Sequence, residues 1–153
     1  MRKRTLRDRA FQAWWRMRRP MTLGVRGVVV DGEGRVLLLR HTYTPGWHFP
    51  GGGVEKGETC PVALLRELHE EAGIETVVAD MRLASVHANL GYFPNDHVLV
   101  YRIDRWHQGK ATQRGEIAET GFFDPLSPPP GVTAGTRRRL DELFGGEPVS
   151  DRW

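Results

Sequence analysis

The sequence lacks the features of several protein classes. It has one cysteine, Cys60, so the chain cannot form an internal disulfide. That fits a reducing compartment, and we expect a cytoplasmic location. No apolar stretch approaches the roughly 20 residues that a membrane-spanning helix needs, so no transmembrane segment is predicted. The six histidines form no pair at zinc-binding spacing, and no internal repeat is present.

The remaining chain of 153 residues is long enough for one domain with a hydrophobic core. Its charge is unevenly distributed. Residues 1–19 carry eight Lys or Arg and one Asp, a charge of +7, and the rest of the chain carries −4. An acidic domain with a basic N-terminal arm therefore describes the chain better than its net charge of +3, which weakens a general nucleic-acid interpretation.

The N-terminal arm, residues 1–20, is predicted to be a basic amphipathic helix. Leu6, Ala10, Phe11, Trp14 and Met17 recur at spacings of three and four residues. We expect this stripe to dock on the domain or on a second subunit, which would make a homodimer. Binding of the arm to a nucleic acid or a membrane surface is the less favoured alternative.

The most informative segment is residues 51–74, which read GGGVEKGETCPVALLRELHEEAGI. From Gly52 it fits the pattern G-x5-E-x7-R-E-U-x-E-E-x-G-U, where U is a bulky aliphatic residue. A chance match in a chain of this size is expected about once in 10^7 sequences or fewer. All nine specified positions are filled, by Gly52, Glu58, Arg66, Glu67, Leu68, Glu70, Glu71, Gly73 and Ile74.

This segment predicts a helix of about 13 residues that follows a glycine-rich loop. Thr59 is a candidate N-cap, and Pro61 falls in the first turn, where its missing N–H costs little. Gly73 ends the helix as a C′ glycine. We expect Leu65, Leu68 and Ala72 to face the core, with Ala63 on the opposite, carboxylate side.

Glu67, Glu70 and Glu71 fall within one arc of the predicted helix about 100° wide. Three adjacent carboxylates repel one another unless a cation or water lies among them. Oxygen ligands select a hard cation, which here means Mg2+, with Mn2+ possible. Such an ion on a pyrophosphate neutralises oxygen charge and positions an attacking water.

With these residues in this order, the chain resembles the Nudix hydrolase family of MutT-like proteins. The resemblance is specific over 51–74 and holds by layout over 22–144. It implies an enzyme that cleaves a pyrophosphate linkage in a nucleoside diphosphate derivative: a dinucleoside polyphosphate, a nucleotide sugar or a nucleoside triphosphate. It also implies an α/β fold, a Nudix-type α/β/α sandwich with a mixed β-sheet and a central catalytic helix.

The resemblance also implies roles for individual residues. The carboxylates of Glu67, Glu70 and Glu71 would bind metal together with the Gly51 carbonyl. Glu116 would supply a further acid, as a metal ligand or general base, and Glu67 is the alternative base. Glu58 and Arg66 would form an ion pair that orients the catalytic carboxylates.

Four residues are candidates for binding the substrate. Gly52 and Gly53 would allow a close approach of the backbone to phosphate. Trp47 and Tyr92 are candidates for stacking on a base. The spacing of Tyr92 from the motif is typical of the dinucleoside polyphosphate branch of the family.

The rest of the sequence predicts strands before and after this helix. Residues 23–30 and 35–40 flank a turn at 31–34 and predict a hairpin, and further strands are predicted at 82–88, 97–103 and 121–123. A last helix is predicted over 133–144. The Nudix-type domain would thus span 21–146, with a mixed sheet between helices and a loose tail over 147–153.

Two alternatives to this enzyme remain. One is a non-catalytic nucleotide-sensing or RNA-binding module on the same fold. The presence of every motif carboxylate favours the enzyme, because a sensor can lose them without cost. The other is an enzyme of the same family whose substrate is the 5′ end of RNA, with the basic arm binding RNA phosphates.

Overall fold

The computed structural model describes residues 14, 17–18, 20–91, 94–113 and 115–153. The predicted helix over 1–20 therefore lies largely outside the described residues, as does Tyr92. Within the described residues no helix is long and apolar enough to cross a bilayer.

The described strands form three small sheets, and the largest of them, in the order β1-β5-β4, is mixed as predicted. β1 (Thr22–Val29) pairs in parallel with β5 (Asp96–Ile103), and β4 (Met81–Ala88) pairs with β5 in the antiparallel direction. β2 (Val36–His41) pairs antiparallel with β7 (Ile117–Phe123). The short strands β3 (Ile74–Glu75) and β6 (His107–Gln108) form a third pair, and the 3-10 turn η1 (Val78–Asp80) precedes β4.

The predicted hairpin over residues 23–40 is only partly correct. The turn forms, with the Asp31 N–H donating to the Arg35 carbonyl at 2.9 Å and one bridge between Val30 and Val36. Beyond that bridge β1 pairs with β5 and β2 pairs with β7. Both strands are apolar at consecutive positions and buried on both faces, which suits strands inside a layered fold.

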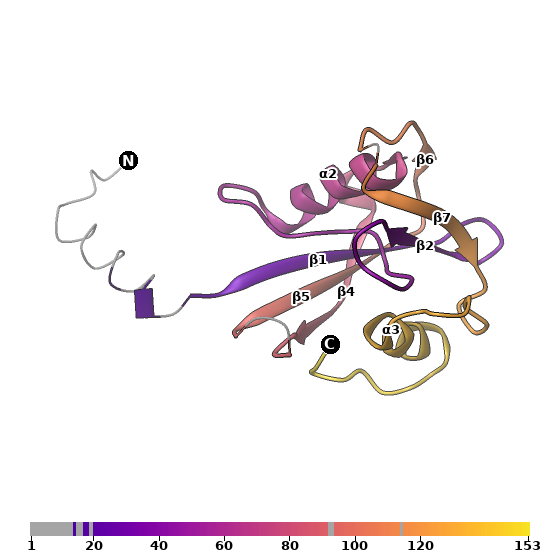
Figure 1. Cartoon of the computed structure of the whole chain (residues 1–153). Coiled ribbons are helices and arrows are strands. Elements are labelled where there is room, and N and C mark those ends of the chain that lie inside the picture. Colours follow the sequence, from indigo (N-terminus) through magenta and orange to yellow (C-terminus); the bar gives the residue numbers. More distant parts are fainter. Residues whose placement is uncertain (1–13, 15–16, 19, 92–93, 114) are drawn as a thin grey trace.

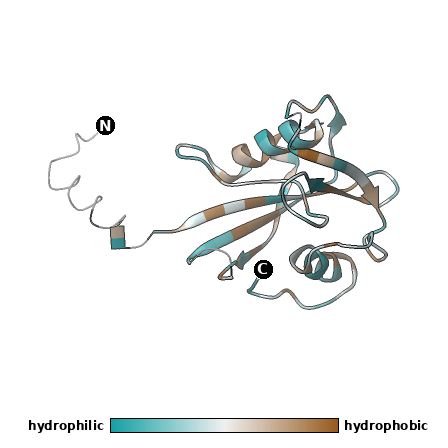
Figure 2. Ribbon diagram, viewed as in Figure 1, coloured by the Kyte–Doolittle hydropathy of each residue, from teal (hydrophilic) through white to brown (hydrophobic). Residues whose placement is uncertain are grey.

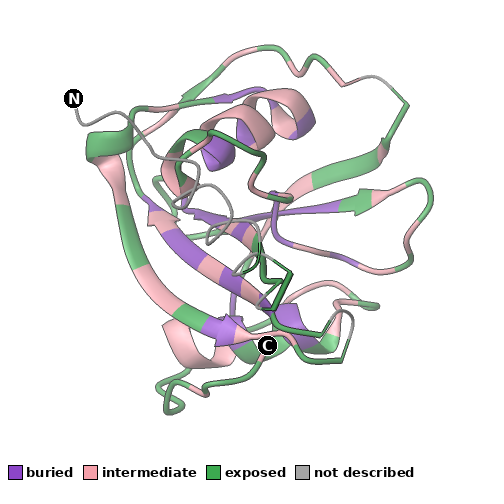
Figure 3. Cartoon of the chain, turned by 90° about the vertical axis from the view of Figure 1, so that its left-hand side faces the viewer, coloured by how far each residue is buried: buried purple, intermediate pink, exposed green. Residues whose placement is uncertain are grey.

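Two helices cover opposite sides of these strands. α2 (Cys60–Ala72) lies on one side and α3 (Ala134–Phe144) on the other, as Figure 1 shows. One buried cluster joins β1 to α2 through Val25, Leu64 and Leu68. A second includes Val28 of β1 and Leu140 of α3. The hydropathy and burial of the ribbon follow this layering, with the sheet interior apolar and buried (Figures 2 and 3). The predicted α/β/α sandwich is confirmed.

Helix α2 has the predicted length but a different buried face. Gly73 ends it with a φ of 65° and donates its N–H to the His69 carbonyl at 3.0 Å. The buried positions are Ala63, Leu64, Leu68 and Glu71, whereas Leu65 is half-buried. The prediction that Leu65 faces the core is wrong, and Ala63, predicted on the carboxylate side, is buried in the core. The helix is turned so that Glu71 reaches the interior.

Helix α3 begins after Thr133, whose hydroxyl accepts the Thr136 N–H. The segment after it, 147–153, is not loose, so that prediction is wrong. The Ala88 N–H donates to the Asp151 carbonyl at 2.8 Å, and the Trp153 N–H donates to the Ala88 carbonyl at 3.0 Å. The indole of Trp153 also packs against Gly135, and this apolar contact fixes the segment between β4 and α3.

Candidate active site

The glycine-rich loop lies against β1. The Val25 N–H donates to the Gly52 carbonyl and the Gly27 N–H donates to the Pro50 carbonyl, each at 2.9 Å. Gly51 has a φ of 139°, and a Cβ added there would lie 2.1 Å from the Val25 carbonyl oxygen. Any other residue would have to break this contact, so the loop can approach β1 only through glycine.

The next two glycines differ from each other. A Cβ on Gly52 would lie 2.3 Å from Oε1 of Glu67, so the missing side chain leaves room for that carboxylate. Nothing lies near the corresponding position of Gly53, whose carbonyl instead accepts an N–H of Arg66 at 3.2 Å. Gly52 lines the cavity described below and Gly53 does not, which weakens the predicted role of Gly53 in binding substrate.

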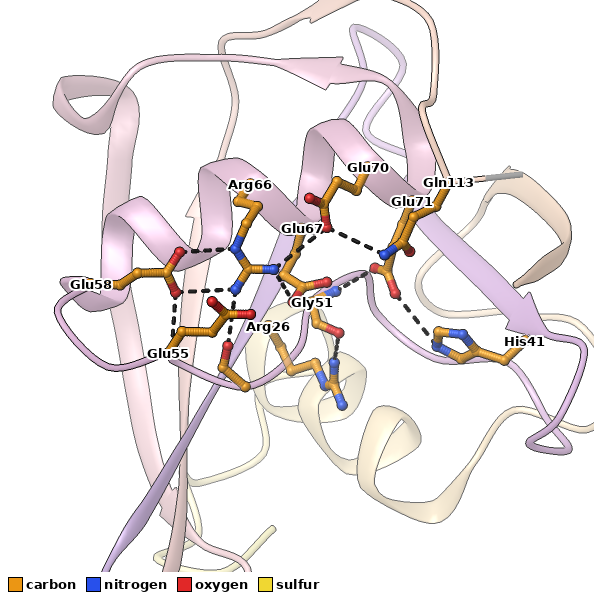
Figure 4. Close-up of polar contacts among 11 residues, drawn as sticks. Arg26, His41, Gly51, Glu55, Glu58, Arg66, Glu67, Glu70, Glu71 and Gln113 are labelled. Atoms are coloured by element: carbon orange, nitrogen blue, oxygen red, sulfur yellow. Dashed lines mark hydrogen bonds and ion pairs between the residues drawn. The ribbon is translucent and has the colours of Figure 1, made fainter. Parts of the chain in front are cut away.

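Arg66 holds the carboxylates of three glutamates (Figure 4). Its Nε donates to Oε1 of Glu58 at 2.9 Å and its Nη2 donates to Oε2 of Glu58 at 3.1 Å. Its Nη1 reaches Oε1 of Glu67 at 2.7 Å and Oε2 of Glu70 at 3.5 Å. The structure thus contains the predicted pair of Glu58 and Arg66. Hydrogen bonds from Arg66 lower the pKa of Glu58 to about 2.

Glu71 is the buried carboxylate of the site, with 5% of its surface exposed. Its Oε2 accepts the Gly51 N–H at 2.8 Å, and its Oε1 lies 3.7 Å from Nε2 of His41. Burial raises the pKa of Glu71 to about 7, and nearby Glu67 adds to the rise. The Gly51 N–H and the Arg26 guanidinium act against this rise.

Glu70 shares the Nη1 group of Arg66 with Glu67 but does not line the cavity that holds Glu67 and Glu71. Its Oε2 accepts the side-chain amide of Gln113 at 3.4 Å as well as the contact from Arg66. The structure therefore brings Glu67 and Glu71 to one cavity and leaves Glu70 beside it.

The cavity has a volume of about 540 Å³ and joins the predicted carboxylates to residues from distant parts of the chain. Glu116 lines it, whereas Glu119 lies 3.6 Å from Arg40 in an ion pair instead. The described residues that line the cavity are Arg26, His41, Tyr43, Thr44, His48, Gly51, Gly52, Glu67, Glu71, Asn89, Gln113, Glu116 and Trp153.

Of the two aromatic residues predicted for substrate binding, Trp47 does not line this cavity, and Tyr92 lies outside the described residues. Trp47 is 6% exposed and packs edge-to-face on Phe123, with ring centroids 4.8 Å apart. Its side chain belongs to the core and not to this cavity, so the predicted stacking role of Trp47 is wrong. Tyr43 and Trp153 line the cavity instead. The signal for Tyr43 was its position three residues after the predicted strand 35–40 and eight residues before Gly51.

Arg26 is a cavity residue that the sequence analysis missed. It belongs to β1, and its Nη1 donates to the carbonyl of Gly51. Burial lowers the pKa of Arg26, and the carboxylates of Glu71 and Glu67 act against that shift. A guanidinium stays protonated under such conditions. The signal was a single arginine inside the apolar stretch GVRGVVV.

The donor set of the cavity fits a hard divalent cation. Glu67, Glu71, Glu116 and the Gly51 carbonyl offer oxygen atoms alone, which suits Mg2+ or Mn2+. Among the described residues, no three His, Cys, Asp or Glu side chains converge as a ready-made metal cluster. In this conformation Glu67 is bound to Arg66, and Glu71 is bound to the Gly51 N–H.

A family model described as the NUDIX domain matches residues 20–143 of the chain. The chain belongs to the NUDIX family. The glycine loop, the Glu58–Arg66 pair and the carboxylates of α2 described above all lie within the matched residues.

Comparison with curated proteins places the chain near several NUDIX relatives. It is 49% identical over 47 residues to an RNA pyrophosphohydrolase from Halorhodospira halophila, which covers 31% of this chain and 26% of that protein. It is 38% identical over 60 residues to a MutT-like protein from Streptomyces ambofaciens, 39% of each protein. These matches span well under half the length of either relative.

Solved structures share the fold over most of the chain. A MutT NUDIX hydrolase from Burkholderia pseudomallei superposes with a TM-score of 0.70 and 24% identity, covering 82% of this chain and all of that one. The E. coli dihydroneopterin triphosphate pyrophosphohydrolase gives a TM-score of 0.62 and 18% identity, over 82% and 96% of the two chains. At these identities the likeness establishes the NUDIX fold.

Proposed function

We propose that this NUDIX protein is a metal-dependent pyrophosphohydrolase that cleaves a pyrophosphate linkage in a nucleoside diphosphate derivative. One observation carries the proposal. The carboxylates of Glu67 and Glu71, the Gly51 carbonyl and Glu116 line one cavity that also holds the cation Arg26. This combination supplies oxygen ligands for a metal and a positive charge for a phosphate.

The residues that would hold Mg2+ or Mn2+ are Glu67, Glu71 and the Gly51 carbonyl, with Glu70 and Glu116 as further ligands. When bound, the ion would neutralise phosphate oxygen charge and lower the pKa of a water. Arg66 keeps Glu67 in place through its hydrogen bond, and Glu58 holds Arg66 from the other side.

The general base is one of two carboxylates. Glu116 is exposed at the cavity, so it can accept a proton from a water there without breaking an ion pair with an arginine in the described structure. Glu67 lies at the same cavity but already accepts a hydrogen bond from Arg66. Both remain candidates, and the pH dependence of the Glu116→Gln variant distinguishes them. Loss of the acidic limb of the profile would assign the base to Glu116.

The substrate class follows from the shape and chemistry of the cavity. A volume of about 540 Å³ lies in the range of small-molecule sites. Tyr43 and Trp153 offer aromatic surface for a base, at a cavity whose other lining includes the carboxylates. Dinucleoside polyphosphates, nucleotide sugars and nucleoside triphosphates all combine a base with a pyrophosphate and are the proposed substrates.

A hydrolysis screen tests this function. The purified chain is incubated with each substrate class and with Mg2+ or Mn2+, and phosphate-containing products are separated by chromatography. We expect turnover of at least one class, lost on chelation. Glu67→Gln should lower kcat by at least about 100-fold, because charge stabilisation of the transition state is reduced. Glu75→Gln, a matched change on β3, should leave kcat unchanged. Equal activity of the Glu67→Gln and wild-type proteins would reject the site.

RNA 5′ ends form a second candidate substrate. Several curated relatives are named RNA pyrophosphohydrolase, and residues 1–19 carry a charge of +7. The same screen therefore includes RNA with a 5′-triphosphate. Preferential release of pyrophosphate from RNA over free nucleoside triphosphate would support this substrate. Tight nucleotide binding with no turnover of any substrate would instead support a non-catalytic sensor.

A further inference from the structure

Arg26 is placed directly beside the carbonyl of Gly51 by backbone pairing. The N–H groups of its two neighbours, Val25 and Gly27, donate to the carbonyls of Gly52 and Pro50. These two hydrogen bonds flank Arg26 and set Gly51 opposite it. The guanidinium then closes the arrangement by donating to the Gly51 carbonyl (Figure 4).

The Gly51 carbonyl therefore has two candidate partners. In the structure it accepts Arg26, and in the proposed function it is a metal ligand. A carbonyl oxygen has two lone pairs, so geometry alone would permit both partners. The two positive charges would prevent simultaneous binding, because a guanidinium and a divalent cation on one oxygen would lie a few ångströms apart and repel each other strongly.

The environment of Arg26 explains why the guanidinium rests there. Glu71 and Glu67 are its principal charged neighbours, and both are acidic. Arg26 also lines the same cavity as these carboxylates. A positive charge at this point offsets the repulsion between the carboxylates, as a bound cation would.

We propose that Arg26 and the divalent cation bind the Gly51 carbonyl alternately, and that the displaced Arg26 guanidinium binds a phosphate of the substrate. This inference rests on the proposed function and adds a residue to it. An arginine fork matches phosphate geometry, and a guanidinium released within the cavity stays within reach of an anion bound there. Metal and substrate would then bind cooperatively, because the substrate phosphate would bind the Arg26 guanidinium that the metal displaces from the Gly51 carbonyl.

Metal binding without substrate tests the first half of the proposal. Binding of Mn2+ to the wild-type protein and to Arg26→Gln is measured by electron paramagnetic resonance of the free ion. Glutamine keeps an N–H donor but carries no charge. We expect Arg26→Gln to bind Mn2+ at least about tenfold more tightly, because the competing charge is gone. Unchanged or weaker Mn2+ binding would overturn the proposal.

Binding of a non-hydrolysable substrate analogue tests the second half. The probe is a nucleoside diphosphate with a methylene bridge between its phosphates, titrated at saturating Mn2+. Arg26→Gln should bind it at least about tenfold more weakly, since one charge-assisted contact is lost. Equal affinity for the analogue would overturn the role of Arg26 in binding phosphate.

Two further variants separate charge from packing. Arg26→Lys keeps the positive charge and should keep Mn2+ affinity near the wild-type value. Arg102→Gln makes the same charge change on β5, where the guanidinium is bonded to Asp104 at 2.9 Å, and should alter neither affinity. Circular dichroism confirms that each variant is folded. If Arg26→Lys tightens Mn2+ binding as much as Arg26→Gln does, the effect is packing and the exchange is rejected.

Failure of the proposed function would look different. If the wild-type protein bound no Mn2+, the metal site would be rejected, and the exchange with it. If Arg26→Gln tightened Mn2+ binding and weakened the analogue while no substrate was hydrolysed, the exchange would stand and the enzymatic function would fail.

Discussion

Glu71 combines burial with a position at the cavity, and this gives the protein a specific pH dependence. A carboxylate in its environment ionises with a pKa of about 7 instead of 4.5. The unfolded chain therefore loses this proton at lower pH than the folded chain does. The contribution of protonated Glu71 to the free energy of unfolding is complete below about pH 4.5 and is lost as the pH rises through 7.

We expect the wild-type protein, in buffer without divalent cations, to lose up to about 3 kcal/mol of stability from this group between pH 5 and pH 8. Glu71→Gln has no such proton to lose, yet its amide oxygen can still accept the Gly51 N–H. Thermal melts at both pH values should show Glu71→Gln gaining several degrees over wild type at pH 8 and little at pH 5. A constant difference across this range would contradict the raised pKa of Glu71.

Arg66 illustrates a residue that acts through others. Its Nε and Nη2 both donate to the Glu58 carboxylate, and its Nη1 donates to the Glu67 carboxylate. A lysine at this position keeps the charge but cannot hold both partners in one plane.

We therefore predict that Arg66→Lys lowers kcat by about 10-fold or more with little change in KM, because the carboxylates are misplaced while substrate contacts remain. Steady-state kinetics at saturating Mg2+ measure both constants. An unchanged kcat with a strongly raised KM would instead place Arg66 on the substrate. Arg137→Lys, on the surface of α3, serves as the control.

At the scale of the element, α3 and the segment 147–153 form one unit. Arg139 is fully buried, donating to Glu142 at 2.6 Å and to the Arg152 carbonyl at 3.2 Å. Trp153 lies with its indole nitrogen 2.3 Å from the position that a Cβ on Gly135 would take. The segment thus packs on α3 only because position 135 has no side chain.

We predict that Gly135→Ala lowers the melting temperature, because overpacking costs about 1–3 kcal/mol and outweighs the better helix propensity of alanine. For a chain of this size that is roughly 2–4 °C for each kcal/mol. In a Trp153→Ala background the same substitution should be neutral or stabilising, since the clash is absent. Destabilisation of equal size in both backgrounds would show that Gly135 matters for another reason.

At the scale of the whole molecule, charge is divided between the N-terminal arm and an acidic remainder. Among the described residues, those that line the cavity run from Arg26 to Trp153. The amphipathic stripe of the arm is exposed where the structure describes it, at Trp14 (46%) and Met17 (77%), so its docking on the domain is not supported and its docking on a second subunit stays a prediction. It includes Phe11, Trp14 and Met17, large apolar side chains that favour burial.

Deletion of residues 1–19 should lower the melting temperature or dissociate a dimer, because the apolar surface on which the stripe docks would become exposed to water. Hydrolysis of a small nucleotide should stay within about threefold of the full-length value, since all the described cavity residues are retained. Thermal melting, light scattering and kinetics on the truncated protein check both effects. Unchanged stability and mass with lost binding to RNA or anionic vesicles would make the arm a polyanion-binding element.

The sequence by itself determined the features that depend on neighbours along the chain. Helix α2 runs over 13 residues to Gly73, as its capping and breaking residues predict. The spacing of Glu67, Glu70 and Glu71 follows from helical periodicity, because these residues lie three and four positions apart or adjacent on one helix. The pair of Glu58 and Arg66, which the family resemblance implied, is present in the structure.

Tertiary structure decided which distant residues meet. It separated β1 from β2, turned α2 to bury Glu71, and put Trp47 into the core. It also brought Arg26, Tyr43 and Trp153 to the cavity beside Gly51. Such contacts depend on how the two layers of helices close over the sheet, and periodicity along one segment carries no information about which segments pack together.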